Sequence, residues 1–279
     1  MILFHTSSEL KKHLHSIKDS GKTIGFVPTM GALHQGHITL IEKSLSDCDL
    51  TVCSIFINPT QFNNTSDFEK YPKTTDQDIL MLEEAGCDVL FLPDVSEIYP
   101  SGFTPKTYPL GNLEKILEGA YRPGHFQGVC MVVERLLSLV PCDNLYLGRK
   151  DYQQCMVIQK LIEIESIKTN LVICDTKRET DGLAMSSRNT RLNPVERQKA
   201  RTIYETLIFM KENLQQLPIH TLEEMSKEKL VLNGFEVDYV SITNAHLEHI
   251  DNAQDSKTIV GLIAASINGI RLIDNMYFS

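Results

Sequence analysis

Short apolar runs alternate with helical patterns through the first two thirds of this 279-residue chain, and this alternation constrains the fold more than any other feature. The apolar runs are rich in Val, Ile and Phe and are bounded by turn residues, as is typical of buried strands. They cover residues 24–27, 50–57, 89–92, 144–147 and 171–174. The helical patterns lie at 9–17, 37–45, 75–85, 128–140 and 151–162. Together they predict an α/β fold, with a Rossmann-like parallel sheet and helices on both of its faces.

Cap and breaker residues predict where some of these helices begin and end. Ser7 precedes the first helix as an N-cap. Gly86 is expected to end the helix over 75–85, and Pro141 the helix over 128–140.

The pattern changes after about residue 175. One long helix is predicted from Pro194 to about residue 213, and a second over 222–232. Alternating strands follow at 237–243, 258–267 and 270–273, and the dipeptide Asn268-Gly269 between the last two is typical of a type I′ hairpin. We therefore expect two domains: a Rossmann-like domain over 1–175, and a smaller C-terminal α+β domain with an antiparallel sheet over 176–279.

Charge and cysteine usage exclude several classes of protein. The net charge is 27 − 36 = −9, which argues against a nucleic-acid coat protein or a basic protein of membrane surfaces. No apolar run approaches the roughly 18–20 residues of a membrane span, and the N-terminus becomes charged too early for a signal peptide. The seven cysteines show no C-x-x-C spacing, so we expect reduced thiols in a cytoplasmic protein.

The richest candidate site lies between a predicted strand and a predicted helix. It consists of Pro28, Thr29, Met30, Gly31, Ala32, Leu33, His34, Gln35, Gly36 and His37. Ligands of open α/β sheets bind at the carboxyl ends of strands, where the next helix presents free N–H groups. His34 and His37 are one helical turn apart, so both imidazoles could donate hydrogen bonds to phosphate oxygens. The alternative is a histidine pair that only caps the helix. The segment matches neither the P-loop nor the G-x-G-x-x-G pattern.

Two further polar clusters follow predicted strands. Asn58 and Gln61 follow the run over 50–57 and offer amide groups, although a plain strand-ending turn is the alternative. The segment from Gly148 to Gln154 follows the run over 144–147; Lys150 within it could pair with an anion, whereas Asp151 is also a good helix cap.

A fourth cluster, Met185-Ser186-Ser187-Arg188, lies near the expected domain boundary. Its arginine and hydroxyl groups could close over a triphosphate, and a polar linker is the alternative. The four clusters point to recognition of anions and amides. The chain shows no Cys or Ser nucleophile paired with a base and no Cys/His zinc spacing. The residues alone therefore indicate a nucleotide-dependent transferase or ligase.

Taken in order, the motifs resemble those of the pantothenate synthetase (pantoate–β-alanine ligase) family over about residues 20–195. They read V-P-T-M-G-A-L-H-Q-G-H, S-I-F-I-N-P-T-Q-F, Y-R-P-G-H-F-Q-G-V, K-D-Y-Q-Q and D-G-L-A-M-S-S-R-N. The first also resembles the H-x-G-H signature of the wider nucleotidyltransferase superfamily. The resemblance implies that ATP and pantoate form pantoyl adenylate and pyrophosphate, and that β-alanine then yields pantothenate and AMP. It also implies Mg²⁺ with the ATP, a homodimer, and a C-terminal domain that acts as a lid.

The resemblance further implies roles for individual residues. Those implied to bind ATP are Pro28, Thr29, Met30, Gly31, Ala32, Leu33, His34, Gln35, Gly36, His37, Gly148, Arg149, Lys150, Asp151, Lys177, Met185, Ser186, Ser187 and Arg188. Those implied to be catalytic are His34, His37, Lys150, Ser186, Ser187 and Arg188. Pantoate is assigned to Met30, Gln61, Val129 and Gln154, and β-alanine to Asn58, Gln61 and Tyr71. Arg122 matches a family arginine near the mouth of the site. His37 is implied to be a proton donor, and plain electrostatic stabilisation stays open as the alternative.

The chain departs from the family pattern at three places. Arg149 stands where glutamate is usual, Lys177 stands where Val or Ile is usual, and the sequence Pro141-Cys142-Asp143 alters the approach to a strand. None of these changes affects the histidines, so we expect activity.

Two alternatives to the ligase stay open from the sequence. One is a nucleotidyltransferase that releases a stable nucleotidyl product, which H-x-G-H alone would permit; the pair Gln61 and Gln154 argues against it. The other is an inactive nucleotide-binding scaffold, and the intact His34, Lys150 and Arg188 argue against that one.

Overall fold

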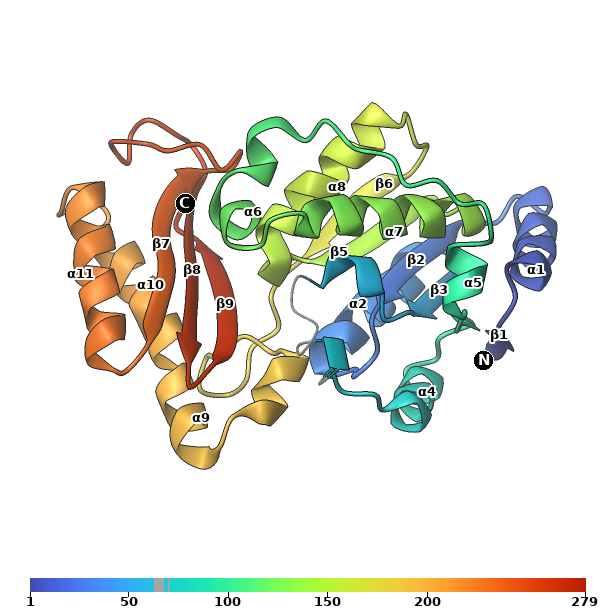
Figure 1. Ribbon diagram of the computed structural model, residues 1–279, viewed down its shortest axis with the longest axis horizontal. Helices are drawn as coiled ribbons and strands as arrows, with labels where there is room; N and C mark the ends of the chain where they lie inside the picture. The colour runs from blue at the N-terminus through green and yellow to red at the C-terminus, as the bar shows by residue number, and fades with distance from the viewer. Residues whose placement is uncertain (63–67, 70) are drawn as a thin grey trace. The chain divides into compact units, whose positions relative to one another are not determined.

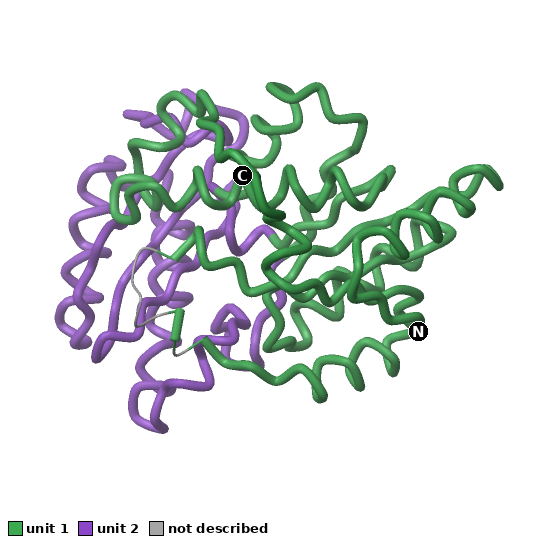
Figure 2. Tube along the Cα trace, turned by 45° about the vertical axis from the view of Figure 1, so that its right-hand side comes forward, with its two compact units in different colours: residues 1–148, 154–175 green, residues 149–153, 176–279 purple. Residues whose placement is uncertain are grey.

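The computed structural model describes residues 1–62, 68–69 and 71–279, which form two compact units (Figure 2). Unit 1 consists of Met1–Gly148 and Gln154–Asp175, and unit 2 of Arg149–Gln153 and Thr176–Ser279. The short segment Arg149–Gln153 thus groups with the C-terminal unit, although it precedes the boundary that the sequence suggests near residue 175.

Unit 1 is built on a six-stranded sheet in which every neighbouring pair is parallel (Figure 1). The order is β1-β4-β3-β2-β5-β6. The strands are β1 (Ile2–Phe4), β2 (Ile24–Thr29), β3 (Leu50–Ile55), β4 (Val89–Phe91), β5 (Asn144–Gly148) and β6 (Asn170–Cys174). Five of them coincide with predicted runs, so the predicted α/β class is confirmed. Sequence periodicity missed β1 because a strand of three residues is too short to show one.

Helices cover both faces of this sheet. They are α1 (Ser7–Asp19), α2 (Gln35–Asp47), α4 (Thr75–Glu84), α5 (Val95–Ile98), α6 (Leu117–Tyr121), α7 (His125–Leu139) and α8 (Tyr152–Ile164). Side chains alternate along each strand, so Phe26 and Leu145 pack in a core with α1, α7 and α8, whereas Val27 and Tyr146 pack in a core with α2 and α4. Within the described residues no helix is both long and apolar enough to cross a membrane.

The structure tests two of the expected helix limits directly. The prediction that Ser7 caps the first helix was wrong by one residue: Thr6 is the N-cap and Ser7 is already helical. Ser and Thr are both common at this position, and Thr6 makes no side-chain capping hydrogen bond here, so the sequence did not distinguish them. Gly86 lies just past the end of α4 with φ 81°, which confirms it as the residue that ends this helix.

Unit 2 contains an antiparallel sheet in the order β7 (Glu236–Asn244), β8 (Ile259–Ile267) and β9 (Ile270–Tyr277). Its helices are α9 (Pro194–Ala200), α10 (Thr202–Asn213) and α11 (Ile219–Leu232). Asn268 and Gly269 have φ 48° and 74°, so the predicted type I′ turn is confirmed. The single helix predicted from Pro194 is instead divided between α9 and α10. The Arg201 N–H bonds to the Lys199 carbonyl and not to a carbonyl one full turn earlier, and apolar periodicity does not reveal this local change.

All seven cysteines are free thiols. Burial raises the pKa of Cys87 and Cys130 to about 12 and that of Cys142 to about 11, and it raises the pKa of Cys53 well above its usual range. A thiol reacts through its thiolate, so we predict that iodoacetamide at pH 8 leaves these four unmodified in the folded protein and alkylates them after unfolding. Mass spectrometry of peptides measures the outcome, with the half-buried Cys48 as an internal comparison. An adduct on any of the four thiols in the native protein would contradict the prediction.

Candidate active site

Two histidines form a reciprocal cap in unit 1, where β2 has ended and α2 begins. His34 is the N-cap residue of α2, and its Nδ1 accepts a hydrogen bond from the Gly36 N–H at 3.1 Å. The Nδ1 of His37, in the first turn, accepts from the His34 N–H at 3.3 Å. The two ring centroids are 4.1 Å apart. The spacing of the two histidines predicted this proximity.

The cap defines the tautomer of both rings. An Nδ1 that accepts a backbone hydrogen bond carries no proton, so each neutral ring carries its proton on Nε2. The Nε2–H groups are therefore the donors by which His34 and His37 would bind an anion at the N-terminus of α2. The dipole of this helix also favours negative charge there. Capping and anion binding use different ring nitrogens, so the two interpretations of the pair are compatible.

Asp78, a residue of α4 that no sequence pattern singled out, holds the loop that precedes this cap. It is 1% exposed, and its oxygens accept from the backbone N–H groups of Ala32 and Leu33 at 2.9 and 2.8 Å. The Thr74 hydroxyl also donates to it, at 3.0 Å. Gly31 has φ 78°, and a Cβ at this position would lie 3.0 Å from the Asp78 carboxylate. The loop therefore requires both a glycine at residue 31 and a buried acceptor at residue 78.

A second cluster of site residues lies in unit 1 around η1 (Pro59–Gln61), which follows β3. Asn58 is 1% exposed, and its Nδ2 donates to Gln61 Oε1 at 3.2 Å. The Tyr99 hydroxyl donates to Asn58 Oδ1 at 2.9 Å. The amide nitrogen of Gln61 lies 2.7 Å from the sulfur of Met30. The structure therefore brings together three predicted substrate residues, and within this group Asn58 orients Gln61.

Helix α7 approaches η1 so closely that only glycine fits at position 128. A Cβ there would overlap the carbonyl oxygen of Thr60 and lie 2.9 Å from the Cα of Gln61. The Gly128 carbonyl also accepts from Asn58 Nδ2 at 3.2 Å. The position of Gln61 thus depends on the absence of a side chain at residue 128 of α7.

A histidine that sequence reasoning did not assign supports Gln61 from the other side. His125 is buried at the start of α7, and its Nδ1 lies 2.8 Å from the Gln61 carbonyl oxygen. Its Nε2 lies 3.0 Å from a guanidinium nitrogen of Arg122. In the sequence, the position of His125 within the motif Y-R-P-G-H was the signal that could have identified it as a site residue. Tyr71 and Val129 are also buried in unit 1.

The remaining predicted residues divide between the units. Gly148 ends β5 and Gln154 lies in α8, both in unit 1. In unit 2, η3 (Arg149–Asp151) carries Lys150, whose Nζ lies 3.4 Å from the Asp151 carboxylate. The Arg149 guanidinium lies 4.3 Å from the centroid of the Tyr277 ring. Arg149 therefore has a cation–π partner within its own unit.

The Met185–Arg188 cluster leads into η4 (Ser187–Arg191), also in unit 2. Ser186 is the N-cap, and its hydroxyl oxygen accepts from the Arg188 N–H at 3.3 Å. The Met185 N–H donates to the Lys177 carbonyl at 3.0 Å. Lys177 thus holds the start of this cluster through its backbone.

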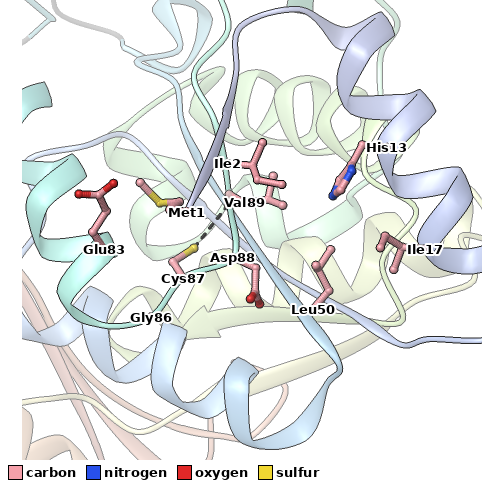
Figure 3. Close-up of a pocket in the computed structure, with 10 residues that line it drawn as sticks. All are labelled: Met1, Ile2, His13, Ile17, Leu50, Glu83, Gly86, Cys87, Asp88 and Val89. Atoms are coloured by element: carbon pink, nitrogen blue, oxygen red, sulfur yellow. Dashed lines mark hydrogen bonds between the residues drawn. The ribbon is translucent and has the colours of Figure 1, made fainter.

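One cavity of about 410 Å³ lies elsewhere in unit 1 (Figure 3). It is lined by Met1, Ile2, His13, Ile17, Leu50, Glu83, Gly86, Cys87, Asp88 and Val89. Leu50 and Val89 are the first residues of β3 and β4, whereas the histidine and glutamine clusters follow the carboxyl ends of β2 and β3. The cavity therefore lies at the amino ends of the strands, opposite the ends that carry the candidate site, and is separate from that site.

The Rossmann-like sheet and the histidine cap after β2 define an α/β protein whose H-x-G-H motif lies between the end of a strand and the start of a helix. A family model described as pantoate-beta-alanine ligase matches residues 2–277. A protein of Porphyromonas gingivalis named pantothenate synthetase is 42% identical, over 100% of this chain and 99% of its own length. The chain therefore belongs to the pantoate–beta-alanine ligase family and is a ligase, which confirms the resemblance inferred from the motifs.

Solved structures agree with this assignment. The crystal structure of pantothenate synthetase from Thermus thermophilus is 38% identical, with a TM-score of 0.93 over 100% of this chain and 99% of that one. The pantoate-beta-alanine ligase of Francisella tularensis, complexed with beta-gamma ATP and beta-alanine, is 38% identical, with a TM-score of 0.85 over 100% of this chain and 98% of that one.

Proposed function

We propose that the protein condenses pantoate with β-alanine at the expense of ATP, through a pantoyl adenylate intermediate. The observation that carries the proposal is the reciprocal cap at the N-terminus of α2, in which Nδ1 of both His34 and His37 accepts a backbone hydrogen bond and the ring proton is therefore assigned to Nε2. Such Nε2–H donors suit the negative charge that develops when a carboxylate attacks the α-phosphorus of ATP. Membership of the ligase family, one solved member of which is complexed with beta-gamma ATP and beta-alanine, supports the same substrates here.

The chemistry proceeds in two balanced steps. The pantoate carboxylate attacks the α-phosphorus and pyrophosphate leaves, which gives pantoyl adenylate. The β-alanine amine then attacks the acyl carbon, loses a proton and displaces AMP, which gives pantothenate. A carboxylate is a poor acyl donor and AMP is a good leaving group, so the protein has mainly to orient the reactants and stabilise charge.

We propose roles for individual residues as the family resemblance implies them. His34, His37, Lys150 and the hydroxyl and guanidinium groups of Ser186, Ser187 and Arg188 bind phosphate oxygens. Met30, Gln61, Val129 and Gln154 hold pantoate. Tyr71 and Gln61 bind β-alanine, and Asn58 contributes by orienting Gln61.

Magnesium is proposed to arrive with ATP. Among the described residues no group of three His, Cys, Asp or Glu side chains is placed to hold a metal ion. Mg²⁺ commonly takes phosphate oxygens and water as its ligands and needs only one or two protein carboxylates. Its contribution would be to neutralise charge on the phosphates of the substrate.

Product analysis of the purified protein tests the proposed function. Pyrophosphate release should require pantoate, and AMP formation should require both pantoate and β-alanine. A nucleotidyltransferase would instead release a stable nucleotidyl product without β-alanine. ATP turnover that is independent of pantoate would rule out the ligase.

Gly128→Ala should raise the KM for pantoate by at least about tenfold, because even a small displacement of a substrate-positioning residue is costly. Helix propensity alone would favour alanine by about 1 kcal/mol. The overlap of the new Cβ with the Thr60 carbonyl outweighs that gain, because backbone has to move. Initial rates of pyrophosphate release at varied pantoate measure the effect, and Ser138→Ala, an exposed change in the same helix, is the control. An unchanged KM for pantoate would refute the role given to Gly128.

We also propose a homodimer in the cytoplasm, as the family resemblance implies. Sedimentation equilibrium should give twice the chain mass of 31.6 kDa. A monomeric mass at micromolar concentration would contradict the dimer.

A further inference from the structure

We propose that Asp274 and Asn275, two neighbouring residues of β9, are positioning residues that fix both nucleotide-binding segments of unit 2. These segments are η3, which carries Lys150, and the Met185–Arg188 cluster. The inference rests on the proposed function, which assigns Lys150 and Arg188 to phosphate oxygens.

Asn275 holds the first segment through one side-chain amide. Its Nδ2 donates to the carbonyl oxygens of Arg149 and Lys150 at 2.9 and 2.8 Å, and the residue is 3% exposed. An amide nitrogen carries two hydrogens in a fixed fork, so it can satisfy two neighbouring carbonyls at once. Tyr277 of the same strand adds a third contact, because its ring lies under the Arg149 guanidinium. The backbone that carries Lys150 is thus held by β9 through the carbonyl groups of Arg149 and Lys150.

Asp274 holds the second segment through a buried ion pair. Its two oxygens accept from Nη1 and Nη2 of Arg178 at 2.6 and 3.0 Å, which is a bidentate arrangement. Burial raises the pKa of Asp274, and the Arg178 guanidinium opposes this effect. Arg178 also donates to the Gly182 carbonyl at 3.0 Å and lies 4.8 Å from the centroid of the Tyr204 ring.

These contacts shape a small hairpin that ends at the Met185–Arg188 cluster. Arg178 pairs with Ala184 in an antiparallel bridge, and the Met185 N–H donates to the Lys177 carbonyl. Gly182 has φ 90°, and a Cβ there would overlap the Tyr204 ring. The cluster begins directly after this hairpin, so the Arg178–Asp274 pair determines where it starts.

Asp274 and Asn275 are adjacent along one strand, about 3.8 Å apart at their Cα atoms. The Asn275 N–H also donates to Asp274 Oδ1, at 2.8 Å, so the two anchors are themselves linked. A displacement at either residue would therefore reach both segments. A misplacement of about 1 Å at a binding group can cost up to about 10²-fold, so we expect these residues to affect ATP binding without touching ATP.

The test compares three variants of the full chain. Asn275→Asp keeps the shape of the side chain but removes both donors, and Asp274→Asn removes the ion pair. Asp238→Asn is the matched control, because Asp238 forms another Asp–Arg pair of the same sheet, with Arg271 Nε at 2.7 Å. Calorimetry gives the Kd for ATP, pyrophosphate release gives KM and kcat, and thermal unfolding gives the Tm.

We expect the first two variants to raise the Kd and KM for ATP by about tenfold or more, with a smaller change in the KM for pantoate. The control should match the wild type. In a Lys150→Ala background, Asn275→Asp should cause a smaller loss than it causes alone, because part of its effect acts through Lys150. Folded variants that bind ATP as the wild type does, or fully additive losses in that background, would overturn the proposal.

Two further measurements keep the outcome decisive. If Asn275→Asp does not fold, Asn275→Ala carries the test, because it removes both side-chain donors without adding a charge. We expect about a tenfold rise in the Kd for ATP. An unchanged Kd in that variant would count against the proposal. If the wild type binds ATP but shows no pantoate-dependent pyrophosphate release, the proposed function fails while the calorimetric comparison still tests the positioning residues.

Discussion

His37→Ala should lower the rate of pantoate-dependent pyrophosphate release by about 10²–10³-fold, the usual cost of one donor that stabilises charge in the transition state. The substitution removes the Nε2–H donor at the N-terminus of α2. It also removes the Nδ1 acceptor of the helix cap, which should lower the free energy of unfolding by about 1 kcal/mol. Stopped-time assays of pyrophosphate and thermal unfolding measure the two effects separately. A rate within twofold of the wild type would show that another residue has this role.

A second substitution at the same position separates proton donation from electrostatic stabilisation. His37→Gln keeps a neutral N–H donor but has no proton to transfer near neutral pH. If His37 only stabilises charge, this variant should retain much more activity than His37→Ala. If His37 transfers a proton, both variants should be equally slow. His15→Ala, which changes an exposed histidine of α1, controls for loss of an imidazole elsewhere.

Asp78→Ala should both destabilise unit 1 and inactivate the enzyme. It leaves the N–H groups of Ala32 and Leu33 without their acceptor, at a cost of about 1–3 kcal/mol for the buried Ala32 donor and less for the part-buried Leu33 donor. The loop before the histidine cap should then shift, so we expect kcat/KM to fall by at least about 10²-fold. Urea unfolding and initial rates measure the two effects.

Two matched variants define what Asp78 contributes. Asp78→Asn keeps one acceptor oxygen and the shape of the side chain, so it should lose less stability than Asp78→Ala. Asp76→Ala removes an exposed carboxylate from the same helix and should behave as the wild type. Full activity of a folded Asp78→Ala protein would refute the role of Asp78 in holding the loop.

Much of the fold could be predicted from the sequence because the central strands are buried on both faces. A strand such as β3 therefore appears as a continuous apolar run, and the Asn268-Gly269 turn has a local chemical signature. The three-residue strand β1 and the turn at Arg201 have no such signature. A pattern in the sequence reports local environment, so elements set by brief or irregular hydrogen bonding were missed.

The same distinction applies to the candidate site. His34 and His37 could be predicted to interact because they are three residues apart on one helix end. Asp78 reaches a loop 46 residues away, and Asn275 reaches a backbone 125 residues away. In the sequence, each of these polar residues resembles an ordinary surface residue, and only the structure shows that it is buried and hydrogen-bonded. Supporting residues of this kind are therefore found from the structure, whereas the residues they support are found from the motif.

The stacking of Arg149 on Tyr277 has an evolutionary consequence. The Arg149 guanidinium packs against the ring of Tyr277 in β9, so a basic side chain at position 149 is stabilised where that ring is present. An acidic side chain gains nothing from the negative face of an aromatic ring. We therefore expect positions 149 and 277 to covary among relatives, with aromatic residues at 277 enriched where 149 is basic. The pair would then behave as one inherited unit, and exchange of either member alone between relatives should be less well tolerated than exchange of both.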